Sequence, residues 1–304
     1  MHRRESTNSR HSPLRREFLL APRLASSESR HYGPAQQGKP GRARLSLPIE
    51  VLYALSGLAV GFIVGLTGVG GGSLMTPLLI LLFGIHPATA VGTDLLYAAS
   101  TKTAGTLVHG FNKTVDWRVV LRLAIGSVPA AAITLWFLAT TGTQTAGTAH
   151  ILALVLGSML VLTAISILFR NTLARFAGAH RELPPLPQTA LTTLTGAVLG
   201  VLVSISSVGA GAIGVTVLML LYPKLSIHRI VGTDIAHAVP LTLVAGLGHW
   251  AIGDVDWHML IALLCGSIPG ILIASRLAPA VNERIIRWLL ALVLTIVGLR
   301  LVTG

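Results

Sequence analysis

Long apolar segments separated by short polar connections occupy most of the chain after residue 48. A membrane-crossing helix needs about 20 residues, and eight of the ten apolar segments approach that length. The other two have about 12 residues and rise only about 18 Å, which is too short for a crossing. We therefore predict an all-α polytopic membrane protein, with four full-length helices and one short or re-entrant segment in each half. The predicted segments are 50–67, 73–84, 88–110, 117–140, 148–168, 188–206, 211–222, 229–252, 257–277 and 284–302.

Each short segment follows a Gly-rich stretch, and the two stretches, 57–73 and 196–212, resemble each other. A helix that breaks inside lipid persists only where protein or a watery cavity receives its unpaired backbone. The helix that restarts after the break presents N–H groups and a positive dipole end, which favour an anion. The glycines that coincide are Gly57 with Gly196, Gly61 with Gly200, Gly70 with Gly209 and Gly72 with Gly211.

The similarity extends beyond the glycines at one constant spacing. The matches are Val91-Gly92-Thr93-Asp94 with Val231-Gly232-Thr233-Asp234, His109 with His249, Val115-Asp116-Trp117 with Val255-Asp256-Trp257, and Gly126-Ser127-Val128-Pro129 with Gly266-Ser267-Ile268-Pro269. Apolar composition alone does not reproduce such matches, so we predict two membrane repeats, 49–169 and 188–304. A basic linker, 170–187, joins them, and a basic tail, 1–48, precedes them.

Loop charges leave the orientation of the repeats open. Loops 141–149 and 253–256 lack basic residues and favour the outside, whereas loops 111–116 and 223–229 carry lysine or arginine and favour the inside. Matching loops thus carry opposite charge, which favours inverted repeats of five segments. If the short segments do not cross, the repeats are instead parallel with four crossings each.

Composition supports the membrane assignment. Apolar residues make up 52% of the chain and charged residues 11%, at a mean hydropathy of +0.73, whereas soluble domains carry about 25% charged residues. The net charge of +12 comes largely from the 1–48 tail, which we interpret as a disordered orienting or lipid-facing arm rather than a nucleic-acid binder. The single cysteine, Cys265, excludes an internal disulfide.

The duplicated pattern G-x-x-G-x-G-G-G-S, V-G-T-D, V-D-W and G-S-x-P resembles the TauE/SafE family of sulfite exporters and sulfonate permeases over residues 50–302. The resemblance implies an all-helical cell-membrane permease of two repeats that moves small anions, often sulfur oxyanions. We expect a small anion and the lipid bilayer as partners, no nucleic acid, no cofactor and no metal. A homodimer is left open.

The two Gly-rich turns and their polar neighbours are the predicted anion site. Four other glycines, Gly57, Gly61, Gly196 and Gly200, are better explained by close helix packing. Lys102 either attracts the anion, neutralises Asp94, or extends to the membrane interface. The candidate binding residues are Gly70, Gly71, Gly72, Ser73, Thr93, Lys102, Ser204, Ser206, Ser207, Gly209, Gly211 and Thr233.

Asp94 and Asp234 are the candidate proton or ion-coupling residues, because carboxyl groups within apolar segments are costly and usually functional. His237 follows Asp234 by one turn and is positioned to share its proton. Alternatively, each aspartate caps a helix that restarts after the preceding glycine. We expect His109 and His249 to lie at the membrane interface, and Trp117, Trp250 and Trp257 to form part of an aromatic belt.

Three functions follow from these residues. An anion permease working by alternating access agrees best with the duplication, the broken helices and the resemblance. A cation permease would use both aspartates as its ion site. A membrane-embedded enzyme is disfavoured, because the histidines are isolated and no metalloprotease or nucleophile-elbow motif occurs.

Overall fold

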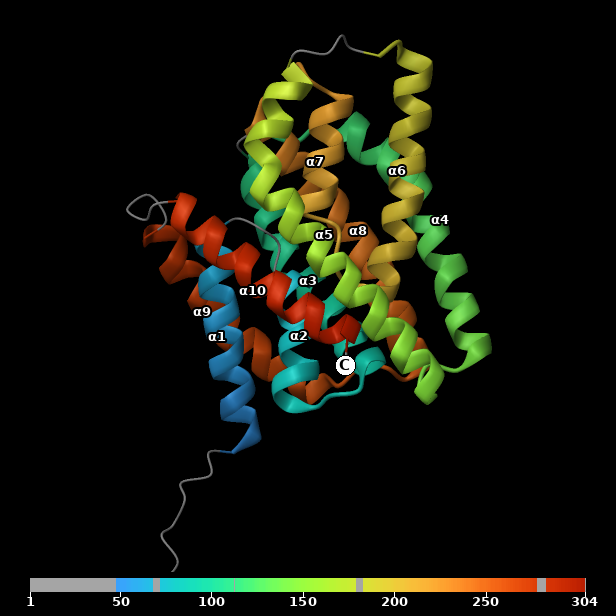
Figure 1. Ribbon diagram of the computed structural model, residues 1–304, viewed down its shortest axis with the longest axis vertical. Helices are drawn as coiled ribbons and strands as arrows, with labels where there is room; N and C mark the ends of the chain where they lie inside the picture. The colour runs from blue at the N-terminus through green and yellow to red at the C-terminus, as the bar shows by residue number, and fades with distance from the viewer. Residues whose placement is uncertain (1–47, 68–71, 112, 179–182, 278–282, 304) are drawn as a thin grey trace, which may run out of the picture. The chain divides into compact units, whose positions relative to one another are not determined.

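The computed structural model describes residues 48–67, 72–111, 113–178, 183–277 and 283–303, which form ten helices and no strand (Figure 1). The predicted basic tail lies outside the described residues. The helices are α1 (Ile49–Thr67), α2 (Gly72–Phe83), α3 (Pro87–Phe111), α4 (Trp117–Thr141), α5 (Ala146–Gly178), α6 (Pro185–Ser206), α7 (Ala212–Leu221), α8 (Ile227–Ile252), α9 (Trp257–Leu277) and α10 (Glu283–Thr303).

The predicted segments agree with these helices to within a few residues at nearly every end. The largest difference is α5, which continues to Gly178 and so enters the stretch 170–187 that we interpreted as a linker. The added residues 169–177 contain neither glycine nor proline, so nothing in them interrupts a helix that is already formed, and the helix ends at Gly178.

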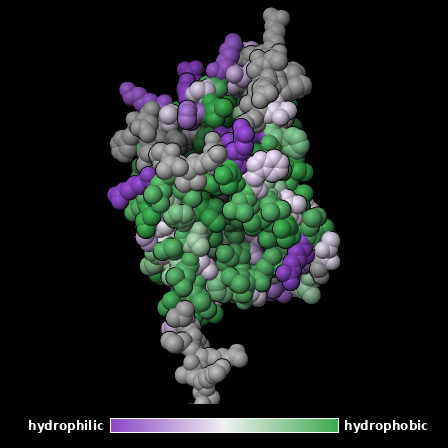
Figure 2. Space-filling view, turned by 60° about the vertical axis from the view of Figure 1, so that its left-hand side comes forward, coloured by the Kyte–Doolittle hydropathy of each residue, from purple (hydrophilic) through white to green (hydrophobic). Residues whose placement is uncertain are grey.

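Seven of the described helices are long and apolar enough to cross a membrane, and α2 and α7 are shorter apolar helices. Helix α3 has 25 residues, but it is not among the seven; its polar residues include Asp94 and Lys102. Large hydrophobic side chains point outward from the long helices, for example Leu121, Trp136 and Leu272. Figure 2 shows such side chains covering most of one face, as expected for a surface that contacts lipid.

Each short helix turns back toward the face from which the preceding helix came. The rings of Tyr53, near the start of α1, and Phe83, at the end of α2, have centroids 4.8 Å apart. In the second half, Gln188 Nε2 near the start of α6 donates to the carbonyl of Leu221 at the end of α7, at 2.8 Å. The pairs α1–α2 and α6–α7 are therefore re-entrant hairpins.

Close helix contacts join the two halves of the chain. Helix α1 packs along α9, and α6 packs along α4. A Cβ at any of four glycines would overlap the backbone of the facing helix: Gly57 with Leu263, Gly61 with Ser267, Gly196 with Leu123 and Gly200 with Ser127. This confirms that these four glycines serve helix packing.

Helices α3 and α8 lie side by side and run in opposite directions. Thr93 Oγ1, in the second turn of α3, accepts a hydrogen bond of 3.1 Å from the N–H of Asp256, just beyond α8. Thr233 Oγ1, in the second turn of α8, accepts one of 2.9 Å from the N–H of Asp116, just beyond α3. The start of each helix therefore lies beside the end of the other.

The polar loops gather at the two ends of these helices. Thr143 Oγ1 donates to Asp254 Oδ1 at 2.8 Å, so the α4–α5 and α8–α9 loops lie together; we call this end the 254 face. Arg229, in the first turn of α8, forms an ion pair of 3.3 Å with Asp116, so the α3–α4 loop lies beside the start of α8 and the α7–α8 loop that leads into it, at the opposite end; we call it the 116 face. In the sequence, the loops at the 254 face lack basic residues and are predicted to lie outside. The loops at the 116 face carry lysine or arginine and are predicted to lie inside.

Candidate functional site

The second Gly-rich turn joins the end of α6 to the start of α7 in the interior of the protein. Ser207 has a left-handed backbone (φ 59°), and its N–H donates to the carbonyl of Val203 at 2.7 Å. Gly209 (φ 123°) and Gly211 (φ 139°) adopt conformations that side chains disfavour. The glycines that the sequence placed here are therefore required by the backbone of the turn.

The three serines of this turn differ in what their hydroxyls do. Ser204 Oγ donates to the carbonyl of Gly200 at 2.8 Å, and Ser206 Oγ donates to that of Leu202 at 2.7 Å. Ser207 Oγ is buried without a hydrogen-bond partner. Of the three predicted binding hydroxyls, that of Ser207 is the one left available for a ligand.

The first Gly-rich turn is described only at its far end. Gly70 and Gly71 lie outside the described residues, and α2 begins at Gly72. The next residue, Ser73, is buried. The predicted anion-binding role of this first turn therefore stays a prediction.

Asp94 is fully buried in the second turn of α3, facing α2. Its Oδ2 accepts a short hydrogen bond from the hydroxyl of Thr76, whereas its Oδ1 has no partner. The Ser207 hydroxyl lies near enough to act on the Asp94 charge, but it does not meet hydrogen-bonding geometry. The two groups therefore approach each other closely without a hydrogen bond.

Lys102 lies two turns after Asp94 and is 6% exposed. Its Nζ donates to the carbonyl of Ala210, in the second Gly-rich turn, at 3.2 Å. Its charge interacts electrostatically with both Asp94 and Asp234. Its burial excludes the interpretation that this side chain extends to the membrane interface. The structure instead brings one cation close to two carboxyl groups.

Asp234 is also buried, but it has fewer partners than Asp94. Its Oδ1 has no hydrogen-bond donor and lies against Gly214 of α7, where a Cβ would overlap it. Ser226 is the N-cap of α8, whose first residue is Ile227, and α3 begins at Pro87. Because both aspartates lie inside continuous helices, the prediction that they cap restarting helices is wrong.

His237 does not bond to Asp234 directly. Its Nε2 lies 2.8 Å from Ser127 Oγ, and its Nδ1 has no partner. The matching residues of the other half, Tyr97 and Ser267, form the equivalent contact at 2.5 Å. Sequence reasoning named His237 but missed Ser127, although both residues fall within the duplicated segments.

Thr93 and Thr233, both predicted to bind substrate, are completely buried. Their hydroxyls accept the hydrogen bonds from Asp256 and Asp116 described above. In the described structure they therefore fix the ends of α3 and α8.

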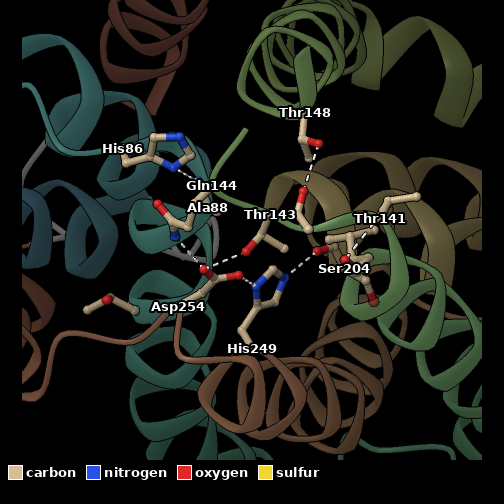
Figure 3. Close-up of polar contacts among 12 residues, drawn as sticks. His86, Ala88, Thr141, Thr143, Gln144, Thr148, Ser204, His249 and Asp254 are labelled. Atoms are coloured by element: carbon tan, nitrogen blue, oxygen red, sulfur yellow. Dashed lines mark hydrogen bonds and ion pairs between the residues drawn. The ribbon is translucent and has the colours of Figure 1, made fainter. Parts of the chain in front are cut away.

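A second buried polar cluster lies between the second Gly-rich turn and the 254 face (Figure 3). His249 Nε2 lies 2.9 Å from the carbonyl oxygen of Ser204, and His249 Nδ1 lies 3.3 Å from Asp254 Oδ2. Asp254 Oδ1 accepts from Thr143 at 2.8 Å and from Gln144 Nε2 at 2.6 Å.

Burial of the Asp254 carboxyl would raise its pKa, but the hydrogen bonds from His249, Thr143 and Gln144 outweigh this and lower it. The expectation of an interfacial His249 is wrong, because its side chain is completely buried. The side chain of His109 lies outside what the structure describes. The only sequence signal for the cluster is that His249 and Asp254 are five residues apart across a helix end.

Other expectations concern the surface and metals. Trp117, Trp250 and Trp257 are exposed at helix ends, and the last two rings meet edge to face at 5.8 Å, as predicted for an aromatic belt. Within the described ranges, no group of three or more His, Cys, Asp or Glu residues is arranged to hold a metal ion.

Comparison with known proteins identifies the same family as the sequence motifs. The family described as "Sulfite exporter TauE/SafE" matches residues 53–301. The chain is 41% identical to the probable membrane transporter protein YjnA of Bacillus subtilis (strain 168), over 84% of this chain and 100% of that protein. It is 28% identical to the probable membrane transporter protein YdhB of the same organism, over 83% and 99%. It is 27% identical to the probable membrane transporter protein MJ0441 of Methanocaldococcus jannaschii, over 84% and 98%. No solved structure matches significantly.

Proposed function

Because the chain belongs to the sulfite exporter TauE/SafE family of multi-pass cell-membrane transporters, we propose that it is a secondary permease for a small anion. Sulfur oxyanions and organosulfonates are the first candidate substrates, in keeping with the family's name. The family and the names of the relatives indicate a transporter rather than an enzyme.

The observation that carries the proposal is the position of Lys102. Its ammonium group is buried and reaches the carbonyl of Ala210 in the second Gly-rich turn. A buried cation requires a compensating charge, which Asp94 and Asp234 supply when they are ionised and a bound anion would supply when they are protonated. A substrate oxyanion beside Ala210 would meet this ammonium, the unpartnered hydroxyl of Ser207 and the amino-terminal end of α7.

The two aspartates support coupling of anion movement to protons. Asp94 and Asp234 each have one carboxyl oxygen without a donor, and a carboxylate without donors is costly in the interior. If both were charged beside Lys102, the site would be negative and would repel an anion. We infer that the carboxyl groups take up protons when the anion binds and release them when it leaves.

Alternating access between two inverted repeats is the proposed route across the membrane. The antiparallel α3 and α8 support it, since segments that match in sequence run in opposite directions. The exchanged packing of α1 on α9 and α6 on α4 supports it as well. In such transporters the substrate site lies between the repeats, near the middle of the bilayer.

Uptake of radiolabelled sulfite by purified protein in proteoliposomes tests the function, with sulfate, thiosulfate, sulfoacetate, taurine, Na⁺ and K⁺ as competitors. Lys102→Gln removes the buried charge and should reduce uptake about tenfold or more, whereas Lys113→Gln, at an exposed lysine, should leave it unchanged. Thermal stabilisation gives a second measurement, since a ligand at about 100 times its Kd adds about 2.7 kcal/mol. Stabilisation by Na⁺ or K⁺ alone, abolished by substitution of both aspartates, would instead establish a cation permease.

A further inference from the structure

The cluster around His249 joins three parts of the chain that are distant in sequence: the end of α6, the end of α8 with the α8–α9 loop that follows it, and the α4–α5 loop (Figure 3). We propose that the contact between His249 and Asp254 closes the 254 face of this transporter over the second Gly-rich turn. The inference rests on the alternating-access function proposed above, to which it adds the residues of one gate.

The hydrogen-bonding partners require the pair to hold a shared proton. The carbonyl of Ser204 can only accept, so His249 Nε2 must carry a hydrogen. An ionised Asp254 can also only accept, so Nδ1 must carry one as well, unless the proton sits on Asp254 instead. In either case the pair is neutral overall; with the proton on Nδ1 it is an ion pair joined by a charge-assisted hydrogen bond, and with the proton on Asp254 it is a hydrogen bond between two neutral groups.

The Ser204 carbonyl connects this pair to the proposed binding turn. Helix α6 ends at Ser206, and the carbonyls of a last helical turn lack N–H donors from within the helix. The Nε2–H of His249 donates to the Ser204 carbonyl, at the place where the chain enters the turn. If Asp254 moves away with its loop, the imidazole loses its orienting partner and this carbonyl loses its donor. Loop position and turn geometry are thereby linked.

Burial indicates that the 254 face is closed in this structure. His249, Asp254 and Ser204 are inaccessible to solvent, and Thr143 is 3% exposed. On the 116 face, by contrast, the ion pair between Asp116 and Arg229 has side chains that are 24% and 44% exposed. The sequence match places Thr114 where the second half has Asp254, so the first half lacks this carboxylate. The two faces are therefore held by different contacts.

Thiol accessibility tests the gate without any substrate. Cys265→Ser removes the single native cysteine, and Ser207→Cys places a reporter in the second turn. In oriented vesicles, a membrane-impermeant maleimide applied to the 254 face should label this reporter slowly. Adding Asp254→Ala should accelerate labelling about tenfold or more, because the hydrogen bond that orients His249 is lost. The matched control is Asp256→Ala, in the same loop, because the Asp256 carboxylate caps α9 and does not touch His249.

The outcomes separate the gate from the substrate proposal. Faster labelling in Asp254→Ala and unchanged labelling in the control support the gate, even if sulfite is not transported. Equal labelling in all three proteins overturns it, even if sulfite is transported. If Asp254→Ala fails to insert, Thr143→Val removes one of the hydrogen bonds to Asp254 and serves as the milder variant, with the same expected direction. Lower thermal stability without faster labelling would show that the cluster is only structural, and would also overturn the proposal.

Discussion

Oδ1 of Asp234 lies directly against the backbone of Gly214, without a hydrogen-bond donor, at the start of the short helix α7. In the matching position of α2 the chain has Met75, and Asp94 contacts the hydroxyl of Thr76 instead. The residue that matches Thr76 is Val215, which has no hydroxyl. The two aspartates therefore occupy unlike surroundings, and their substitution should have unlike effects.

Gly214→Ala should impair transport strongly, because the added methyl group must displace either Asp234 or α7. Overpacking of this kind costs about 1–3 kcal/mol, and here the strain falls on a proposed coupling residue. Uptake and thermal stability of the purified variant measure both effects. Gly147→Ala is the control, because a Cβ at Gly147 meets open space; equal behaviour of the two variants would contradict a specific role for Gly214.

Asp234→Asn should separate exchange from accumulation. An amide cannot gain or lose a proton, so the variant should exchange internal for external anion yet lose accumulation driven by a pH gradient, by about tenfold or more. Counterflow and gradient-driven uptake in the same proteoliposomes measure the two activities. Glu50→Gln, at an exposed carboxyl group, should change neither. Full accumulation by Asp234→Asn would place the coupling proton elsewhere.

The lowered pKa of Asp254 predicts a loss of stability in acid. A carboxyl group whose folded pKa is depressed stabilises the protein above its unfolded pKa, about 3.9, and this contribution is lost as pH falls through the folded value. Wild type should therefore melt at a higher temperature than Asp254→Asn near neutral pH, and the difference should shrink below about pH 4. Melting curves of both proteins in detergent from neutral to acidic pH test this; a difference independent of pH would contradict it.

The re-entrant hairpins make a prediction about topology. In the Cys265→Ser background, single cysteines at His86 and Thr145 should be labelled from the same side of the membrane, because both lie toward the 254 face. A cysteine at Lys113, on the 116 face, should be labelled from the other side. Labelling of His86 and Thr145 from opposite sides would mean that α2 crosses the membrane.

Sequence periodicity and length predicted the fold well, because each membrane helix must satisfy its own backbone and so leaves a long apolar signal. The predicted segment 257–277 coincides with α9, and 73–84 falls within one residue of α2 at both ends. The continuation of α5 past residue 168 was missed, since polar residues there end the apolar signal but not the helix.

The candidate site was predicted only in part. Asp94, Lys102 and Asp234 stand out because charge is rare in apolar segments, and they lie in one cluster. Thr76, Ser127 and Gly214 gave no such signal, because threonine, serine and glycine are ordinary in membrane helices. Their roles follow from contacts between helices, which no pattern within a single segment contains.

The packing of α1 against α9 also has a consequence for biosynthesis. The ribosome makes α1 long before α9, so the newly inserted helix waits in the bilayer with lipid beside Gly57 and Gly61. These glycines receive their protein partner only when nearly the whole chain has been translated. A nascent chain that stops after the first half therefore leaves α1 unpaired, and we expect membrane quality-control proteases to recognise such a fragment.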